Sequence, residues 1–478
     1  MVFELKERKK KTRVVCTIGP ASEDEKMLKK LILAGMNVMR LNFSHGDYEE
    51  HGGRIITARK LSKELNKNIA ILLDTKGPEI RTGDFVGGAA NFKKGQVSTI
   101  CVEDIEGTAD RFTITYKDLY KDVKPGGFIL VNDGQVELLV DHVEGTDIVC
   151  VCANDGVVKN KRGINVPGIK LGFDYLSPKD TADITFGCEQ GVNFIAASFV
   201  RRAQDVLDVK KLLIENGHPE IQIIAKIENS EGVDNMDEIL KVADGIMVAR
   251  GDLGVEVPAE DVPLIQKKLI KKCRAVGKVV ITATQMLDSM QENPRPTRAE
   301  VSDVANAIYD GTDAIMLSGE SAQGKYPEEA VMTMTKIALK TEETLDYASF
   351  LRKAIRTAPE DPSEAICMSV AEIASKFKVS AIVVYTESGS TAKRVSRYRP
   401  ESMIIAATPN EPVTRSLALN WGVKGVVCKW MGDRVSQIEY AQILAKENGV
   451  EPGEQILITA GTPGVGGTTS YLELVTVK

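Results

Sequence analysis

Residues 221–252 read IQIIAKIENSEGVDNMDEILKVADGIMVARGD and contain two short apolar runs with a plausible helix between them. Each run is continuous, not alternating, which predicts a strand buried on both faces. The first run ends in Lys226 and Glu228, and the second ends in Arg250, Gly251 and Asp252. This unit predicts a parallel sheet that carries reactive side chains at the carboxyl ends of its strands.

The same unit repeats on both sides of this stretch. Eight apolar runs qualify as strands, each followed by a plausible helix: RVVCTIG, MNVMRLNFSH, IAILLDTKG, VNFIAASFV, IQIIAKIEN, DGIMVARGD, KVVITATQM and DAIMLSGES. Eight such units closing on themselves predict a (β/α)8 TIM barrel, whose active site lies at the C-terminal strand ends. The first helix is expected to start near Ser22, at capping-box spacing from Glu25, and to end at Gly35.

The pattern of strands and helices is interrupted once. Residues 82–177 are rich in Gly, Val and Thr and carry turn signals in VNDGQVEL and VEGTDIVCV, which predicts an inserted small all-β barrel. The barrel domain would then comprise residues 1–81, with 1–10 as an N-terminal extension, and 178–345. Residues 346–478 would form a C-terminal α/β domain.

This C-terminal segment has five candidate strands: AIVVYT, MIIAAT, GVVCK, QILITAG and LELVTV. The loops TESGST and GTPGVGGTT follow two of them, which predicts an open sheet with a ligand crevice at its strand ends. Hydroxyls before a helix start, with cations close behind, suit an anion; ordinary turn chemistry is the alternative. The candidate residues are Thr386, Ser388, Ser390, Thr391, Lys393 and Arg394.

Composition narrows the class of partner and the compartment. The net charge of −6 argues against nucleic acid as the main partner, and no apolar run predicts a membrane span. The N-terminus MVFELKERKKKTR lacks the apolar core of a signal peptide, so we expect a cytoplasmic protein. The eight cysteines form no C-x-x-C pair and sit mostly in apolar runs, so we interpret them as core residues.

Lys226 and Glu228 are two positions apart on one strand, so they share a face and point towards the barrel mouth. A structural ion pair is the alternative interpretation of this pair. Asp252 on the next strand supplies a second carboxylate. Two carboxylates with few other hard ligands suit Mg²⁺, which keeps waters and binds substrate oxygens.

Earlier strands add further polar groups. Arg40, Asn42 and Ser44 alternate on one face, and Arg40 suits a phosphoryl group because guanidinium binds phosphate oxygens bidentately. Together with Asp74 and Thr75 on the following strand, Asn42 and Ser44 offer neutral oxygens and a single negative charge, which suits a weakly charged ion.

These residues lie in stretches that resemble the signature stretches of the pyruvate kinase family. The stretches are MRLNFSHG, LDTKGPEIR, KIEN, MVARGDLGVE, TATQMLDSM, NPRPTRAE and MLSGESA, in the order of that family and with a β insertion in the same place. The resemblance runs from about residue 11 to the C-terminus. It implies transfer of the phosphoryl group of phosphoenolpyruvate to ADP.

The resemblance also implies a role for each matching residue. Divalent metal, Mg²⁺ or Mn²⁺, would be bound by Glu228 and Asp252, and K⁺ by Asn42, Ser44, Asp74 and the carbonyl of Thr75. Phosphoenolpyruvate would be bound by Arg40, Lys226, Gly251, Asp252 and Thr284. The nucleotide would lie near Asn42, His45, Arg81 and Arg162. Many members have lysine at the position of Arg162, which leaves that contact geometry open.

Three functional expectations follow from the same resemblance. Glu79 occupies the position where K⁺-requiring members carry glutamate and K⁺-independent members carry lysine, so we expect K⁺ dependence. Lys226 would neutralise charge on the transferring phosphoryl group and on the enolate oxygen. Thr284, with Ser318 and Glu320 behind it, would relay a proton to the enolate through water; a lysine donating directly is the competing idea.

The remaining expectations concern regulation and assembly. The β insertion would be a lid that closes over the barrel mouth. A phosphorylated effector would bind the C-terminal domain, and the helix that begins at the Thr297–Glu300 capping box would form a subunit contact in a homotetramer.

Two rival functions use much of the same sequence. A metal-dependent barrel enzyme acting on pyruvate enolates, such as an aldolase, would share the paired carboxylates and the arginine but would not need the K⁺ residues or the lid. A non-enzymatic relative that keeps only effector binding would not need Lys226, Glu228, Asp252 and Thr284.

Overall fold

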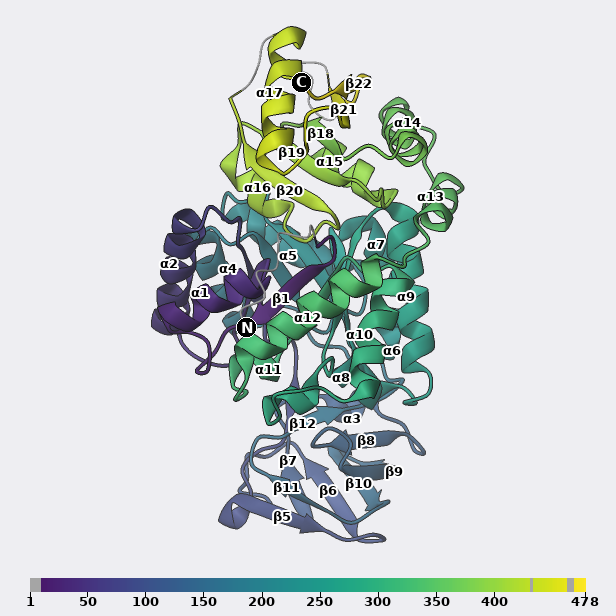
Figure 1. The fold of residues 1–478 in the computed structure, drawn as a ribbon. Helices are drawn as coiled ribbons and strands as arrows, with labels where there is room; N and C mark the ends of the chain where they lie inside the picture. Colours follow the sequence, from purple (N-terminus) through teal and green to yellow (C-terminus); the bar gives the residue numbers. More distant parts are fainter. Residues whose placement is uncertain (1–9, 430–432, 462–467) are drawn as a thin grey trace.

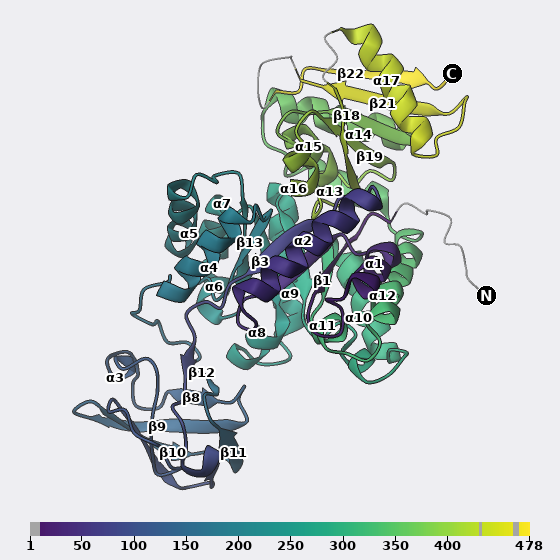
Figure 2. The same ribbon diagram turned by 90° about the vertical axis from the view of Figure 1, so that its left-hand side faces the viewer.

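The computed structural model describes residues 10–429, 433–461 and 468–478. The chain folds into three parts in a row, with a barrel in the middle (Figure 1). An all-β unit lies at one end of the barrel and an α/β unit lies at the other, and the second view shows the same order (Figure 2).

Eight parallel strands close the central barrel in the order β1-β17-β16-β15-β14-β13-β3-β2. This confirms the (β/α)8 barrel that the apolar runs predict, with every run supplying one strand. The strands are β1 (Arg13–Thr17), β2 (Val38–Asn42), β3 (Ala70–Asp74), β13 (Phe194–Ala197), β14 (Gln222–Ile227), β15 (Gly245–Ala249), β16 (Val279–Ala283) and β17 (Ala314–Leu317).

Helices follow each strand and cover the outside of the barrel (Figure 1). The capping box of Thr297 and Glu300 is present, but the first helix is capped by Asp24, so the expected cap at Ser22 is wrong. Ser22 is instead buried and hydrogen-bonded to Gly19. The barrel helices are α1 (Glu25–Ala34), α2 (Tyr48–Glu64), α4 (Pro178–Glu189), α5 (Ala203–Glu215), α6 (Ser230–Asp234), α7 (Met236–Val242), α8 (Arg250–Glu256), α9 (Val262–Val276), α10 (Arg298–Asp310), α11 (Gly319–Ala322) and α12 (Pro327–Glu342), with the 3₁₀ turn η2 (Asp288–Gln291).

Strand alternation sorts the barrel side chains into two layers. In β14, Ile224 belongs to the cluster that fills the barrel interior, whereas Ile223 and Ala225 pack against the outer helices. Leu419 of the C-terminal unit joins the interior cluster. The next inward position after Ile224 is Lys226. The inward side chains of β14 therefore change from apolar to charged towards the carboxyl end of the strand.

The inserted unit is built from a seven-stranded sheet in the order β4-β12-β8-β9-β10-β6-β7 and a two-stranded sheet of β11 and β5. A bridge between Thr82 and Ile114 joins the ends of the two edge strands, so the larger sheet curls towards a barrel. Its first strand begins two residues before the expected boundary at 82. The elements are β4 (Ile80–Arg81), η1 (Val86–Gly88), β5 (Ala89–Phe92), β6 (Val97–Cys101), β7 (Arg111–Thr113), α3 (Leu119–Asp122), β8 (Phe128–Val131), β9 (Val136–Glu144), β10 (Asp147–Cys152), β11 (Gly156–Lys159) and β12 (Gly163–Asn165).

The C-terminal unit is an open five-stranded sheet in the order β20-β19-β18-β21-β22, in which only β22 runs antiparallel to its neighbour. This confirms the predicted open α/β sheet, although most of the loop GTPGVGGTT lies outside the described residues. The elements are α13 (Tyr347–Ile355), α14 (Pro362–Phe377), β18 (Ala381–Tyr385), α15 (Ser390–Arg397), β19 (Met403–Thr408), α16 (Glu411–Ser416), β20 (Val423–Val427), α17 (Arg434–Glu447), β21 (Gln455–Ala460) and β22 (Tyr471–Thr476).

Two further observations bear on the expectations from composition. All eight cysteines are buried and free, which agrees with their interpretation as core residues. Among the described residues, no helix combines the length and the apolar character needed to cross a bilayer.

Candidate active site

Lys226 lies at the end of β14, 7% exposed, with its ammonium among polar groups of three strands. Nζ donates to Oδ1 of Asp74 at 2.9 Å and to Oγ of Ser198 at 2.7 Å, and lies 3.0 Å from Oε1 of Glu228. Burial alone would lower the pKa of Lys226, but the carboxylates of Asp74 and Glu228 outweigh it and raise the pKa. Lys226 is therefore a fixed positive charge at the barrel mouth.

Arg40 reaches the same carboxylate from the other side. Its Nε donates to Oδ2 of Asp74 at 2.6 Å, and its Nη1 donates to Oγ1 of Thr17 at 2.8 Å. Burial acts to raise the pKa of Asp74, but Arg40 and Lys226 lower it below the ordinary value. The ionised carboxylate of Asp74 thus pairs with two cations, Arg40 and Lys226, that lie far apart in the sequence.

Glu228 and Asp252 lie beyond this charge cluster, after β14 and β15. The backbone N–H of Phe199, a residue with φ of 53°, donates to Oε2 of Glu228 at 2.6 Å. Burial raises the pKa of Glu228 to about 7, Lys226 acts to lower it, and the negative charges of Asp252 and Asp74 raise it further. Burial and the neighbouring negative charges outweigh the one adjacent cation, Lys226, so the pair fits a divalent cation.

The number of carboxylates also fits a hard cation that keeps part of its water shell. Within the described ranges, no group of three or more His, Cys, Asp or Glu side chains is arranged to hold a metal. Mg²⁺ is commonly bound by one or two carboxylates together with substrate oxygens and water. Glu228 and Asp252 match that pattern better than they match a site made of protein ligands alone.

The four residues expected to bind K⁺ lie on and just after two neighbouring strands. Asn42 and Asp74 are register partners in β2 and β3, and Oδ1 of Asn42 accepts the backbone N–H of Ser44 at 3.2 Å. The carbonyl of Thr75 accepts the hydroxyl of Ser198 at 2.6 Å. Oxygens that each retain a free lone pair, next to a single carboxylate, fit a large monovalent cation.

Thr284 follows β16 and has φ of 67°, an uncommon conformation for a β-branched residue. Its hydroxyl accepts the backbone N–H of Gly251 at 2.7 Å and donates to the carbonyl of Ala283 at 2.6 Å. The structure therefore brings Gly251 and Thr284 together, as the sequence predicts. The left-handed backbone of Thr284 is the kind of strain that clusters at active sites.

Glu320 is held by backbone groups. Its carboxylate accepts the N–H of Ser318 at 2.8 Å and that of Leu287 at 3.1 Å, and burial raises its pKa. In the described part of the chain no hydrogen bond links Glu320 directly to Thr284, so any proton exchange between them needs an intervening group.

A cavity of about 290 Å³ lies between the barrel mouth and the inserted unit. His45, Arg81 and Arg162, which the sequence places near a nucleotide, line it together with Glu79 and Asp252. Arg81 donates to Glu79 at 2.7 Å and to the carbonyl of Lys161 at 2.9 Å. The inserted unit contributes Arg162 and Asp133 to the lining and the barrel contributes Asp252 and Arg201, so charges of both signs lie on both sides.

Residues of the expected effector loop point in more than one direction. Thr391 is buried against Thr469, and Thr386 accepts the N–H of Gly389. Arg394 is paired with Asp361 at 3.3 Å, whereas Lys393 lines a pocket against the barrel. Ser388 and Ser390 remain at the start of α15.

Ser198 is the main site residue that sequence reasoning missed. It touches Lys226, Asp74 and the carbonyl of Thr75, although its only signal was its place in the cluster ASF at the end of β13. Sequence reasoning also missed Thr17 and Phe199. Thr17 contributes a hydroxyl to Arg40, and Phe199 contributes a backbone N–H to Glu228.

Comparison with known proteins gives consistent matches over the whole chain. The family model "Pyruvate kinase, barrel domain" matches residues 9–331, and "Pyruvate kinase, alpha/beta domain" matches residues 364–475. A pyruvate kinase of Clostridium acetobutylicum is 52% identical over 471 residues, covering 98% of this chain and 100% of the relative. One from Geobacillus stearothermophilus is 53% identical over 470 residues, covering 98% of this chain and 80% of the relative. A crystal structure of a pyruvate kinase from Cryptosporidium parvum has a TM-score of 0.94 at 39% identity, covering 98% of this chain and 97% of that one.

Proposed function

The chain belongs to the pyruvate kinase family, and from this premise we propose which of its residues carry out the reaction. It is a phosphotransferase that moves the phosphoryl group of phosphoenolpyruvate to ADP, giving pyruvate and ATP in the final step of glycolysis. The aldolase alternative is set aside because both matching family models describe pyruvate kinase domains.

The observation that supports the site assignment best is the shared carboxylate of Asp74. It holds Arg40 and Lys226 on its two oxygens, and Lys226 in turn contacts Glu228. Two positive side chains in fixed positions at a barrel mouth suit a small anion that carries both a phosphoryl group and a carboxylate. Fixed charges of this kind stabilise a transition state without having to reorganise.

In this proposal Arg40 and Lys226 bind the phosphoryl group and orient it towards the nucleotide. Lys226 also faces the oxygen on which negative charge develops as the phosphoryl group departs. The N–H groups near Gly251, and Thr284, orient the carboxylate of phosphoenolpyruvate. These roles need positioning and charge, which is the main contribution a protein makes to phosphoryl transfer.

Pyruvate kinases require a divalent metal, and the K⁺-requiring members of the family also need K⁺. We propose that Glu228 and Asp252 hold Mg²⁺ or Mn²⁺, and that Asn42, Ser44, Asp74 and the carbonyl of Thr75 hold K⁺. When bound, the two ions would supply positive charge next to the phosphoryl and enolate oxygens. The raised pKa of Glu228 and the neutral oxygens beside Asp74 support these assignments.

The enolate left by phosphoryl transfer needs a proton at its methylene carbon. The hydroxyl of Thr284 is the proposed last group of a relay that passes through water from Ser318 and Glu320. Burial raises the pKa of Glu320, so this carboxyl keeps a proton at a higher pH than a solvated one does and can hold a proton of the relay.

The nucleotide is proposed to bind in the cavity of about 290 Å³. Arg81 and Arg162 would approach the phosphates of ADP, with His45 and Asn42 at the barrel side. Arg162 belongs to the inserted unit and Arg81 lies in β4, directly at its edge, so the position of that unit decides whether both reach the nucleotide. We therefore propose that residues 82–177 act as a lid on a barrel made of residues 1–81 and 178–345.

Regulation and assembly are proposed for the rest of the chain. Residues 346–478 would bind a phosphorylated effector near Ser388 and Ser390, and α10 would contact a second subunit in a homotetramer. We also propose a cytoplasmic location, supported by the charged N-terminus without an apolar core.

A coupled assay of pyruvate formation tests this function directly. It is run with phosphoenolpyruvate, ADP and Mg²⁺, once with K⁺ and once with Na⁺ as the sole monovalent cation. The proposal predicts turnover that requires ADP and Mg²⁺ and falls strongly when Na⁺ replaces K⁺. Equal rates in the two salts would contradict the K⁺ site, and no ATP formation would contradict the function.

A further inference from the structure

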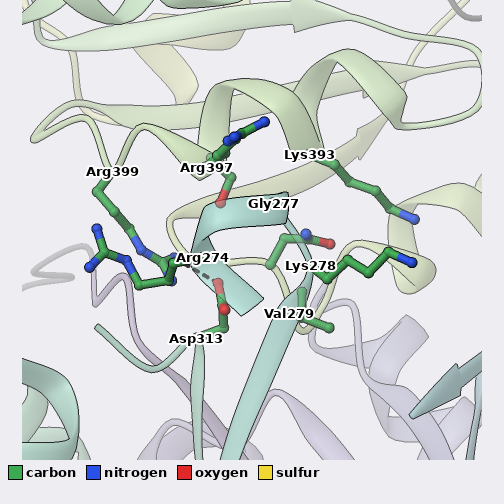
Figure 3. Close-up of a pocket in the computed structure, with 10 residues that line it drawn as sticks. Arg274, Gly277, Lys278, Val279, Asp313, Lys393, Arg397 and Arg399 are labelled. Atoms are coloured by element: carbon green, nitrogen blue, oxygen red, sulfur yellow. Dashed lines mark hydrogen bonds and ion pairs between the residues drawn. The ribbon is translucent and has the colours of Figure 1, made fainter. Parts of the chain in front are cut away.

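A second cationic site lies at the end of the barrel opposite to the mouth, where the C-terminal unit docks (Figure 3). We call it the interdomain pocket. Five cations and one amide line it: Arg274, Lys278, Lys393, Arg397, Arg399 and Asn420. Arg274 and Lys278 belong to the barrel, and the other four belong to the C-terminal unit.

The five cations of the pocket have fewer ion pairs with carboxylates than they could form. Arg399 is paired with Asp313 at 2.6 Å, and Arg397 lies 3.3 Å from Glu364. Within the described ranges, Arg274, Lys278 and Lys393 form no ion pair with a carboxylate. Arg397 and Arg399 are buried and paired, whereas Arg274, Lys278 and Lys393 are half-buried and, among the described residues, lack a paired carboxylate, so the pocket carries an excess of positive charge between two packed domains.

Several polar atoms of the pocket lack the hydrogen bonds that burial requires. Among the described residues, seven buried side-chain atoms have no partner, and three of them belong to this pocket: Nε of Arg274, Nε of Arg397 and Oδ1 of Asn420. Arg397 is 8% exposed and Asn420 is 5% exposed. Unpaired groups of this kind are costly and indicate an occupant such as an ion or a water.

The pKa values of three lining cations are lowered. Burial, and then the charge of Arg399, lowers the pKa of Arg274 to about 10. Burial also lowers the pKa of Lys393 and that of Lys278, against the raising effect of Asp244. An anion in the pocket would favour the charged form of all three side chains.

The dimensions and donors indicate which anion fits. The void measures about 10 Å³, room for one atom the size of a water oxygen, and it opens to solvent. Figure 3 shows Lys278 and Lys393 extending towards the same side of the pocket. One phosphate oxygen fits the void, and the unpartnered Nε–H groups of Arg274 and Arg397 are the donors that the lining offers it. The other oxygens stay in the opening near the lysines, and the hydroxyl of a monohydrogen phosphate can donate to Oδ1 of Asn420.

We propose that the interdomain pocket binds a phosphate group, as inorganic phosphate or as the end of a phosphomonoester. Because the ligand touches both the barrel and the C-terminal unit, its binding stabilises the docking of one on the other. The site is separate from the barrel mouth and shares only Lys393 with the candidate effector residues before and in α15. It does not depend on the roles proposed there.

Thermal unfolding in increasing inorganic phosphate tests the site, with acetate holding the ionic strength constant. The full-length protein is used with Mg²⁺, K⁺ and phosphoenolpyruvate present, so that the proposed phosphoenolpyruvate position is already filled. The parent should show a saturable rise in Tm. Arg274→Gln and Lys393→Gln should lose more than half of that rise, because each removes a cation that no carboxylate pairs.

Lys271→Gln is the matched control, since Lys271 is an exposed cation on the same helix as Arg274 and does not line the pocket. It should keep the full rise in Tm. An equal phosphate effect in the parent and in both pocket variants would overturn the proposal. A titration with glycerol 3-phosphate separates the sources: a larger rise than with phosphate assigns an ester, and a smaller rise assigns the free ion.

A crystal soaked in selenate, a heavier tetrahedral oxyanion, gives a direct second readout. An anomalous peak in the interdomain pocket, next to Arg274 and Arg397, is expected. Selenate peaks elsewhere with none in the interdomain pocket would contradict the assignment, whatever the unfolding data show.

Discussion

The ammonium of Lys226 lies 2.9 Å from Oδ1 of Asp74, although the two residues are 152 positions apart in the chain. The other oxygen of this carboxylate accepts Nε of Arg40 at 2.6 Å. The barrel makes this possible because β2, β3 and β14 all end at the same mouth. The carboxylate of Asp74 therefore holds the two proposed catalytic cations, Arg40 and Lys226, in place before any substrate binds.

Asp74→Asn should lower both the free energy of unfolding and the rate of pyruvate formation. Loss of this charge leaves Lys226 and Arg40 without their common partner, and removing one member of a buried ion pair costs about 3–5 kcal/mol. Urea unfolding and the coupled assay measure both effects. Asp183→Asn is the control, because the partner of Asp183, Lys179, is half exposed and the loss should be smaller. Equal losses in the two variants would contradict the role of Asp74 as the shared anion.

Ser198→Ala should lower kcat without changing the fold. Its hydroxyl accepts from Lys226 at 2.7 Å and donates to the carbonyl of Thr75 at 2.6 Å, so it positions both a catalytic cation and a proposed K⁺ ligand. Loss of such a supporting contact typically costs about 10–100-fold. The expected signature is a lower kcat with a higher K⁺ requirement.

Ser321→Ala serves as the control for that variant. Ser321 is also buried and donates to a backbone carbonyl, that of Thr17, at 2.8 Å, but it does not touch Lys226. A K⁺ requirement that rises equally in both variants would indicate a general loss of packing, not a positioning role for Ser198.

Glu79→Lys should make the enzyme independent of K⁺. Glu79 lines the nucleotide cavity and is held by Arg81 at 2.7 Å, and a lysine ammonium there would supply the positive charge that K⁺ provides. The measurement is the ratio of kcat in K⁺ to kcat in Na⁺. Glu79→Gln should stay K⁺-dependent, and if it also lost the dependence, the added charge would not be the cause.

Closure of the inserted unit should be visible in solution. Asn165 donates to Glu256 at 2.9 Å, so the lid already touches the barrel across the cavity. Small-angle scattering should show a smaller radius of gyration after addition of Mg²⁺, phosphoenolpyruvate and ADP. An unchanged radius of gyration in the presence of all three ligands would contradict the lid.

Much of the barrel could be predicted from the sequence because its strands are continuous apolar runs. The face shared by Lys226 and Glu228 follows from strand alternation, and the contact at 3.0 Å agrees with it. The order of the strands around the barrel follows from the repetition of one unit, since each new strand is added beside the last.

Other features depend on contacts that no local pattern encodes. Ser198 has the same local environment as many strand-end serines, and only the closed barrel brings it to Lys226. Capping-box spacing predicts Ser22 as the cap of α1, because spacing alone does not distinguish it from Asp24. In the structure Asp24 caps the helix, and Ser22 is hydrogen-bonded to Gly19 instead. The interdomain pocket was missed because its cations come from distant segments, α9 and α15.

The central claim is that Lys226 stabilises the transferring group and is not merely a structural partner of Asp74. The most direct test is a single-turnover measurement of pyruvate formation by Lys226→Met, with phosphoenolpyruvate affinity measured by calorimetry on the same sample. Loss of a preorganised charge at the transition state predicts a rate at least about 10³-fold lower, with affinity changed less than about tenfold. Turnover near that of the parent would contradict the account.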